Sequence, residues 1–203
     1  MKKYAVLHEP GDIVTLAGTR FVVLDVERRG SLPDSLFLLA LESVGASEFG
    51  SSNNYAESDL KKAVDKWLED MGKRGLDNAE LIPREIDLTT LDGSGCYGKL
   101  SVKAAPLTLD EAREYADIIP NAERWCWLAT GWSGPSKSDG DLALYVNSAG
   151  GWGHYDCSLS VGIRPALKIP SDLLLDSADK PDLSEVPTDT LLEEIRRRVV
   201  DKA

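Results

Sequence analysis

Trp125-Cys126-Trp127-Leu128-Ala129-Thr130 is a tryptophan-rich run that predicts a β-strand in the C-terminal third of the chain. This third closes on Val161-Gly162-Ile163-Arg164-Pro165-Ala166-Leu167, and the final strand is predicted over Ile163 to Ile169. Pro165 has no N–H donor, so it must lie at an edge, a bulge or a strand start. Between the two runs, residues 142–147 alternate between two faces and lead through a glycine turn to a returning strand over 152–157.

The N-terminal part of the chain also predicts strands. Residues 13–16 and 21–26 are rich in β-branched and aromatic residues, and the short connection between them contains Gly18, so they predict a hairpin. Residues 36–41 are apolar and too few for most helices, which indicates a strand buried on both faces. We expect the antiparallel sheet of residues 123–169 to be continuous with, or packed against, this hairpin.

Two helices are predicted in the middle of the chain. Ser58 can cap the first, whose apolar residues share one side: Leu60, Val64, Trp67, Leu68 and Met71. The second begins at Thr108-Leu109-Asp110-Glu111, which is a capping box. Residues 76–106 lack sustained periodicity and predict a long loop that packs as part of the fold or serves binding. Helices and strands are segregated, which is typical of an α+β fold.

Charge and composition exclude several classes of partner. The chain has 203 residues and a formal net charge of −11, and its basic residues form no strip apart from Arg196-Arg197-Arg198, so we expect no nucleic-acid partner. The apolar run after Met1-Lys2-Lys3 is too short for a signal peptide, and no stretch approaches the roughly 18 apolar residues of a membrane span. Three cysteines cannot all pair within one chain. We therefore expect a soluble protein of a reducing compartment, with no membrane partner.

A change in composition divides the chain into two parts. Residues 1–170 contain the predicted strands and helices and are expected to form one domain. Residues 171–187 mix Asp, Ser and Pro, and Thr190 can cap a helix with an apolar stripe. The part over 171–203 is thus predicted to be a tether and a terminal helix, which docks on its own domain or self-associates with a neighbour.

The order of these segments and several short motifs resemble a family of uncharacterised bacterial and prophage-associated domains known as DUF6273. In addition to the two runs quoted first, the matching motifs are Gly11-Asp12-Ile13-Val14, Phe21-Val22-Val23-Leu24, Ser52-Asn53-Asn54-Tyr55, Asp87-Leu88-Thr89-Thr90-Leu91-Asp92 and Tyr145-Val146-Asn147-Ser148. The resemblance covers about residues 10–175. It implies a bacterial protein with a phage or prophage association, and we expect such a protein to be cytoplasmic before any particle assembly.

The C-terminal pattern is also similar to C-type-lectin-like domains, including relatives of the formylglycine-generating enzyme and variable phage receptor-binding proteins. In that group a tryptophan-bearing strand, a hairpin and a final arginine-containing strand build the half that binds ligands. The resemblance implies a C-type-lectin-like α+β fold with antiparallel sheets, two helices and long loops. The Glu-Pro-Asn, Gln-Pro-Asp and Trp-Asn-Asp sequences of calcium-dependent sugar binding do not occur in this chain.

The polar residues predict neither a metal nor a cofactor. His8 and His154 are too few and too far apart in the sequence for a histidine cluster. Asp139, Asp141 and Asp156 are hard oxygen ligands that can meet in space, but we interpret them as ordinary exposed acids.

Cys126, Cys157 and Arg164 are assigned structural roles. A free cysteine on a strand is often simply buried, and the spacing of the two cysteines does not advertise a reactive thiolate. A partly buried Arg164 needs a carboxylate or carbonyl partner, which indicates a structural clamp. The alternative is an oxidase related to the formylglycine-generating enzyme, in which Cys126 and Cys157 approach each other and bind copper.

Aromatic residues beside Gly/Ser-rich turns are the candidates for ligand binding. Trp132, Trp152 and Tyr155 can stack on a sugar or fill a pocket of a partner, and Asn147 precedes the same turn. Trp125 and Trp127 fall on one face of a strand and are expected in the core. We therefore predict a noncatalytic binding module for a protein or a carbohydrate, with loops 131–140 and 148–157 as the binding face. A structural accessory protein of a phage particle is a further alternative.

Overall fold

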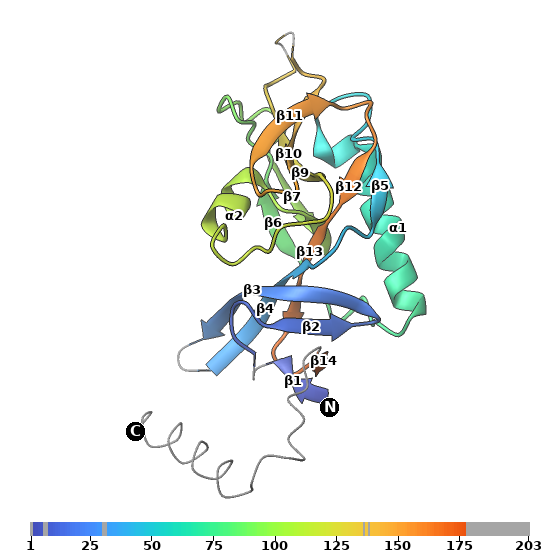
Figure 1. Ribbon diagram of the computed structural model, residues 1–203, viewed down its shortest axis with the longest axis vertical. Helices are drawn as coiled ribbons and strands as arrows, with labels where there is room; N and C mark the ends of the chain where they lie inside the picture. The colour runs from blue at the N-terminus through green and yellow to red at the C-terminus, as the bar shows by residue number, and fades with distance from the viewer. Residues whose placement is uncertain (1, 6–7, 30–31, 136, 138, 178–203) are drawn as a thin grey trace, which may run out of the picture.

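The computed structural model describes residues 2–5, 8–29, 32–135, 137 and 139–177. The protein is a mixed α+β structure with mostly antiparallel sheets and, in the described residues, two α-helices (Figure 1), which confirms the predicted class. The helix predicted at Thr190 lies outside the described residues.

A seven-stranded sheet forms one end of the molecule. In spatial order its strands are β1 (Lys2–Tyr4), β14 (Leu174–Ser177), β2 (Ile13–Leu16), β3 (Thr19–Arg29), β4 (Leu32–Ala40), β13 (Pro165–Pro170) and β8 (Ala104–Pro106). The predicted N-terminal hairpin and third strand are confirmed as β2, β3 and β4. Ala17 and Gly18 make the β2–β3 turn with positive φ angles of 47° and 77°, a region that glycine adopts without steric cost. β14 follows residue 170, the predicted end of the domain.

A smaller sheet of five strands forms the opposite end. In spatial order its strands are β11 (Trp152–Asp156), β10 (Leu142–Val146), β9 (Cys126–Gly131), β12 (Val161–Ile163) and β5 (Gly45–Ser47). The three strands predicted at 125–130, 142–146 and 152–157 are confirmed. All pairs in this sheet are antiparallel except β12 with β9, which is parallel.

Two continuous segments join the sheets into one structure. β4 pairs with β13 in the large sheet. β5, which follows β4, and β12, which precedes β13, pair with each other in the small sheet. The N–H of Val44 donates to the carbonyl of Ile163 at 2.8 Å where this two-stranded ribbon changes sheet. Arg164 occupies the single position between β12 and β13, so the predicted last strand is divided there.

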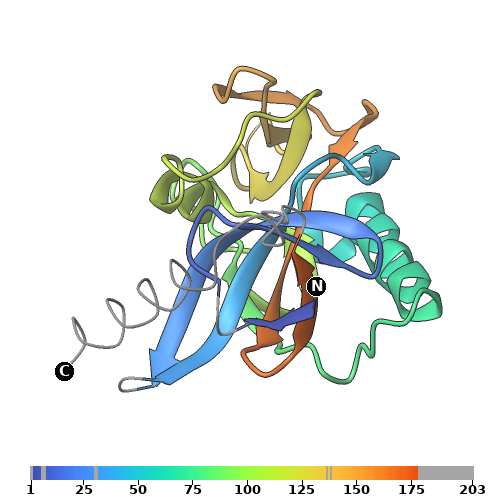
Figure 2. The ribbon, with the colours of Figure 1, turned by 60° about the horizontal axis from the view of Figure 1, so that its bottom comes forward.

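The helices cover opposite sides of this framework (Figure 2). Ser58 caps α1 (Asp59–Lys73) through a bond from the Lys61 N–H, as predicted, and Leu60, Val64, Leu68 and Met71 of α1 are buried. Thr108 and Glu111 complete the predicted capping box of α2 (Leu109–Glu114). A short 3-10 helix, η2 (Tyr55–Glu57), precedes α1.

The segment predicted as a long loop over 76–106 contains further strands. β6 (Arg84–Asp87) and β7 (Lys99–Val102) form a separate hairpin, and β8 joins the large sheet. Arg84 is 4% exposed, forms an ion pair with Glu111, and lies 5.1 Å above the ring of Phe37. These strands are short and their polar residues interrupt the apolar pattern, which explains why the sequence did not predict them.

The core has two parts, one on each side of the sheets. Alternate residues of β3 and β4 belong to different parts, so these strands are buried on both faces as the apolar run 36–41 predicted. On the α1 side, Trp127 is 1% exposed, packs edge-to-face on Phe49 at 5.6 Å, and donates its indole N–H to the Ser47 carbonyl at 3.0 Å. Leu128, the next residue, points to the α2 side.

We expect Trp127→Ala to lower the free energy of unfolding by about 3–5 kcal/mol, because it leaves a large cavity and an unpaired carbonyl. Urea unfolding followed by circular dichroism measures the loss. Trp152→Ala is the matched control, since Trp152 is 51% exposed, and it should change the unfolding free energy far less. Equal losses in the two variants would contradict the assignment of Trp127 to the core.

Candidate functional site

β11 is the outer strand of the small sheet, and four of its five residues are exposed. It pairs with β10 in register from Leu142↔Asp156 to Val146↔Trp152. The N–H of Asn147 donates to the Gly151 carbonyl at 2.7 Å, so Asn147 and Gly151 are a hydrogen-bonded pair. Hydrogen-bonded and non-hydrogen-bonded pairs alternate along an antiparallel ladder, and Trp152 and His154 therefore belong to non-hydrogen-bonded pairs. It follows that the backbone N–H and C=O groups of Trp152 and His154 point away from β10. This edge therefore offers backbone hydrogen-bonding groups as well as side chains.

One face of the β11 edge carries Trp152 and His154, because alternate residues of a strand share a face. The guanidinium of Arg113, on α2, lies 4.6 Å above the ring of Trp152. The rings of Trp132 and His154 are 4.0 Å apart. Two of the predicted aromatic candidates thus lie on the α2 side of the small sheet.

The other face carries Tyr155 within a group of three rings. Trp125 and Tyr145 stack in parallel planes with ring centroids 4.7 Å apart, and Tyr155 meets both edge-on, at 5.7 and 5.8 Å. Gly153 makes room for this stack, since a Cβ there would lie 2.9 Å from the Tyr145 hydroxyl. We call Trp125, Tyr145 and Tyr155 the aromatic stack.

Trp125 corrects an expectation from the sequence. It was predicted to lie in the core with Trp127, but it is 42% exposed. Trp127 lies within β9, whereas Trp125 precedes the first residue of that strand and is covered in part by the rings of Tyr145 and Tyr155. Tyr145 was also not named from the sequence as a candidate for ligand binding. The alternation of Tyr145 with the apolar Leu144 in the predicted strand is the signal that could have identified it.

Asn147 lies in the turn between β10 and β11. Its side-chain oxygen accepts bonds from the N–H groups of Ala149 and Gly151, at 2.8 and 3.0 Å. This is an Asx turn, which stabilises the hairpin connection. The structure therefore places Trp132 and Trp152 on one face, Tyr155 on the other, and Asn147 in the turn that joins the strands.

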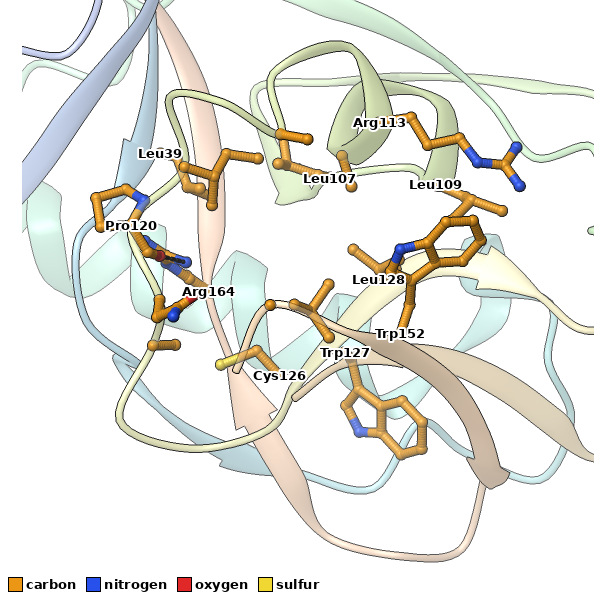
Figure 3. A pocket seen from close by; sticks show the side chains of 17 residues that line it. Leu39, Leu107, Leu109, Arg113, Pro120, Cys126, Trp127, Leu128, Trp152 and Arg164 are labelled. Atoms are coloured by element: carbon orange, nitrogen blue, oxygen red, sulfur yellow. Dashed lines mark hydrogen bonds between the residues drawn. The ribbon is translucent and has the colours of Figure 1, made fainter. Parts of the chain in front are cut away.

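A cavity of about 240 Å³ lies on the α2 side, between α2, the loop that follows it and the small sheet (Figure 3). Most of its lining is aliphatic: Leu39, Leu107, Leu109, Ala112, Ala116, Ile119, Pro120, Ala122, Leu128 and Val146. Trp152 and Arg113 lie at one side of it and Arg164 at the other, whereas the Trp127 indole points away. The sequence did not predict this cavity, because its walls come from distant segments.

Arg164 is the clamp that the sequence predicted. Its Nε–H donates to the Ala40 carbonyl at 2.7 Å, and its Nη1–H donates to the Pro120 carbonyl at 2.9 Å. The residue is 6% exposed, and burial lowers the pKa of its guanidinium. Arg164 therefore ties the loop after α2 to the ribbon that joins the two sheets.

The two buried cysteines lie in different environments. Cys126 lines the cavity, and Cys157 belongs to the core on the α1 side. Burial raises the pKa of the Cys126 thiol and raises that of Cys157 to about 12. Neither thiol is held as a thiolate, which is the form that reacts or binds soft metals. Cys96 is exposed, and all three are free thiols.

In the described ranges, no group of three or more His, Cys, Asp or Glu side chains is placed to hold a metal ion. Hydrogen bonds from the hydroxyl of Ser158 and from its N–H, the latter at 2.8 Å, lower the pKa of the Asp156 carboxyl. Among the helices that the structure describes, none combines the length and apolar character of a membrane crossing.

No protein-family model matches the chain, and comparisons with curated proteins and with solved structures find no match.

The raised pKa of Cys157 predicts a loss of stability in alkali. In the unfolded chain the thiol ionises near pH 8.5, whereas in the folded protein it stays neutral until about pH 12. The stabilising contribution is thus complete below about pH 8.5 and is lost as the pH rises toward 12. Urea titrations at several pH values should show a shallower alkaline decline for Cys157→Ala than for wild type. Cys96→Ala is the control and should follow wild type; identical slopes in all three proteins would contradict the prediction.

Proposed function

We propose that this protein is a noncatalytic recognition module with a C-type-lectin-like fold, which binds a protein or carbohydrate ligand at the β11 edge of the small sheet. One observation carries the proposal: three of the five exposed large apolar side chains in the described residues are Trp125, Trp152 and Tyr155. Exposed aromatic side chains that gather at one edge are typical of interaction sites.

The topology supports the C-type-lectin-like part of the proposal. A strand from near the C-terminus, β13, returns to pair with β4 from the N-terminal part, and both helices lie between these strands in the sequence. Four of the five strands of the small sheet, β9 to β12, follow the second helix, and they include β10 and β11, which carry Tyr145, Trp152 and Tyr155. Membership of the DUF6273 family and a prophage setting belong to the same proposal and rest on the sequence motifs.

A protein ligand is favoured by the open backbone of β11. The outward N–H and C=O groups of Trp152 and His154 can pair with an extended peptide, which then adds a strand to the sheet. The strand carries none of the lysines or prolines that commonly protect exposed edges. Aromatic side chains on both faces would contact alternate side chains of the added strand.

A carbohydrate ligand is favoured by the aromatic stack. The stacking of Trp125 on Tyr145 holds the indole in place, and Trp125 remains 42% exposed. A fixed aromatic ring with one free surface is suited to stacking on the C–H groups of a sugar. Binding to a preformed platform also loses little side-chain entropy.

The oxidase alternative is not supported by the positions of the thiols. Cys126 and Cys157 lie on opposite sides of the small sheet, and burial raises the pKa of both. A reaction through either thiolate would first have to overcome this desolvation.

A glycan array and a peptide-display library, both probed with the full chain, test the proposal. We expect Trp152→Ala, Tyr155→Ala and Trp125→Ala to weaken binding of the selected ligand about tenfold or more, with small changes in melting temperature. Trp132→Ala should act in the same direction. Leu91→Ala is the matched control, since Leu91 is exposed but lies in the loop after β6. Variants that melt as low as Trp127→Ala would show that these aromatic residues belong to the core and not to a binding face.

His154→Pro distinguishes the two ligand classes. Proline removes the outward N–H of residue 154, which no strand uses in the described structure, and proline is tolerated on edge strands. If a peptide adds to β11, His154→Pro should weaken its binding well beyond His154→Ala, which removes the same side chain. A carbohydrate on the aromatic stack should bind both variants equally.

A further inference from the structure

The cavity on the α2 side has mostly apolar walls, but two positively charged side chains also line it. Among the described residues that line it there are two arginines, Arg113 and Arg164, and no aspartate or glutamate. This contrasts with the whole chain, whose formal net charge is −11. An apolar space with charge of only one sign selects a ligand of the opposite charge.

Arg164 has hydrogen-bonding capacity left over. Its Nε and Nη1 groups donate to the carbonyls of Ala40 and Pro120, but its buried Nη2 has no hydrogen-bond partner in the described structure. Leaving a buried donor unpaired costs free energy, so native structures rarely do so without a reason.

The comparison with Arg84 shows what is missing. Arg84 is similarly buried, donates to two backbone carbonyls and also leaves one buried nitrogen, Nε, without a partner in the described structure, but its charge is paired with the carboxylate of Glu111. Among the residues that the structure describes, no carboxylate forms a hydrogen bond with Arg164, whose partners are the carbonyls of Ala40 and Pro120. The carboxylate of Glu42 acts on Arg164 through its charge, in the direction that raises the pKa of the guanidinium, but it is itself paired with Arg20. Buried charges are normally paired, so Arg164 lacks an anion that Arg84 has.

We infer that this cavity binds a small amphipathic carboxylate, which pairs with the guanidinium of Arg164 and places an alkyl or aryl body between α2 and β9. The guanidinium supplies the charge-assisted hydrogen bond that an anion needs in an apolar space. Leu107, Leu109, Leu128 and Val146 supply the apolar walls.

The dimensions of the cavity fit such a ligand. Its volume is about 240 Å³, and an apolar cavity of about 150 Å³ already accommodates benzene. Trp152 and Arg113 stack on each other at the side opposite Arg164, and Trp152 is exposed, so these two side chains lie where a ligand can enter. A ligand bound in this way would extend from the buried arginine toward the exposed tryptophan.

Titration of the full chain with octanoate tests the inference, and octanamide is the neutral control of the same length. We expect saturable one-to-one binding of octanoate at pH 7 by calorimetry, and binding of octanamide about tenfold weaker or more. The guanidinium resonances of Arg164 in nitrogen-15 spectra should shift with octanoate and much less with octanamide. Equal binding of the two ligands, or no saturable octanoate binding up to about 10 mM, would overturn the inference.

Ala112→Phe tests the location, because Ala112 lines the cavity from α2 and a phenyl group there occupies the space. This variant should lose octanoate binding while its melting temperature stays close to wild type. Ala79→Phe makes the same substitution at an exposed position away from the cavity and should bind octanoate normally. Unchanged binding by a folded Ala112→Phe variant would place the ligand elsewhere and contradict the inference.

This inference goes beyond the proposed recognition function. A negative result for octanoate binding would leave the recognition proposal standing, and a negative result for the recognition proposal would leave octanoate binding standing. Octanoate binding requires no partner and does not depend on the aromatic stack. Conversely, Ala112→Phe leaves Trp125, Tyr145 and Tyr155 in place on the other side of the small sheet.

Discussion

Arg164 occupies the point on which the whole arrangement depends. The two-stranded ribbon of β4–β5 and β12–β13 passes from the large sheet to the small one, and Arg164 lies at the change of sheet. Its bonds to the carbonyls of Ala40 and Pro120 fix both the bend of the ribbon and the loop after α2. A lysine would offer a single nitrogen in place of the two, Nε and Nη1, that the planar guanidinium directs at these carbonyls. The cavity, the position of α2 and the orientation of the small sheet all depend on this contact.

The small sheet packs on the core with one face and borders the cavity with the other. Adjacent residues of β9 point to these two faces in turn. Trp127 fills the core on the α1 side, where Phe49 and the Ser47 carbonyl receive it. Leu128 faces α2, which is only six residues long. Such a short helix and the loop after it cover the sheet incompletely, which leaves the cavity. At the β11 edge both faces reach solvent, so aromatic residues on either side are exposed.

Much of the fold was predictable because its signals are local. The hairpin at residues 13–26, the Ser58 cap and the Thr108–Glu111 capping box each depend on neighbouring residues, and the structure confirms them. The hairpin of β6 and β7 was missed, because its four-residue strands are stabilised by contacts such as Arg84 with Glu111 that no local pattern shows. The site was predicted less well: the sequence identified aromatic residues near β11 but did not show which of them share a face.

By itself, the sequence determined the N-terminal hairpin, the two helices and their caps, the mixed α+β class, the structural clamp at Arg164 and the aromatic character of the region after β9, because periodicity, caps and residue type act over a few residues. Only the tertiary structure decided that Trp125 is exposed while Trp127 is buried, and that Tyr155 and Trp152 lie on opposite faces. It also decided that the thiols of Cys126 and Cys157 lie apart and that the apolar cavity is lined by Arg164, whose Nη2 has no hydrogen-bond partner in the described structure. These properties depend on which distant segments pack together, and that is settled by burial and pairing across the whole fold.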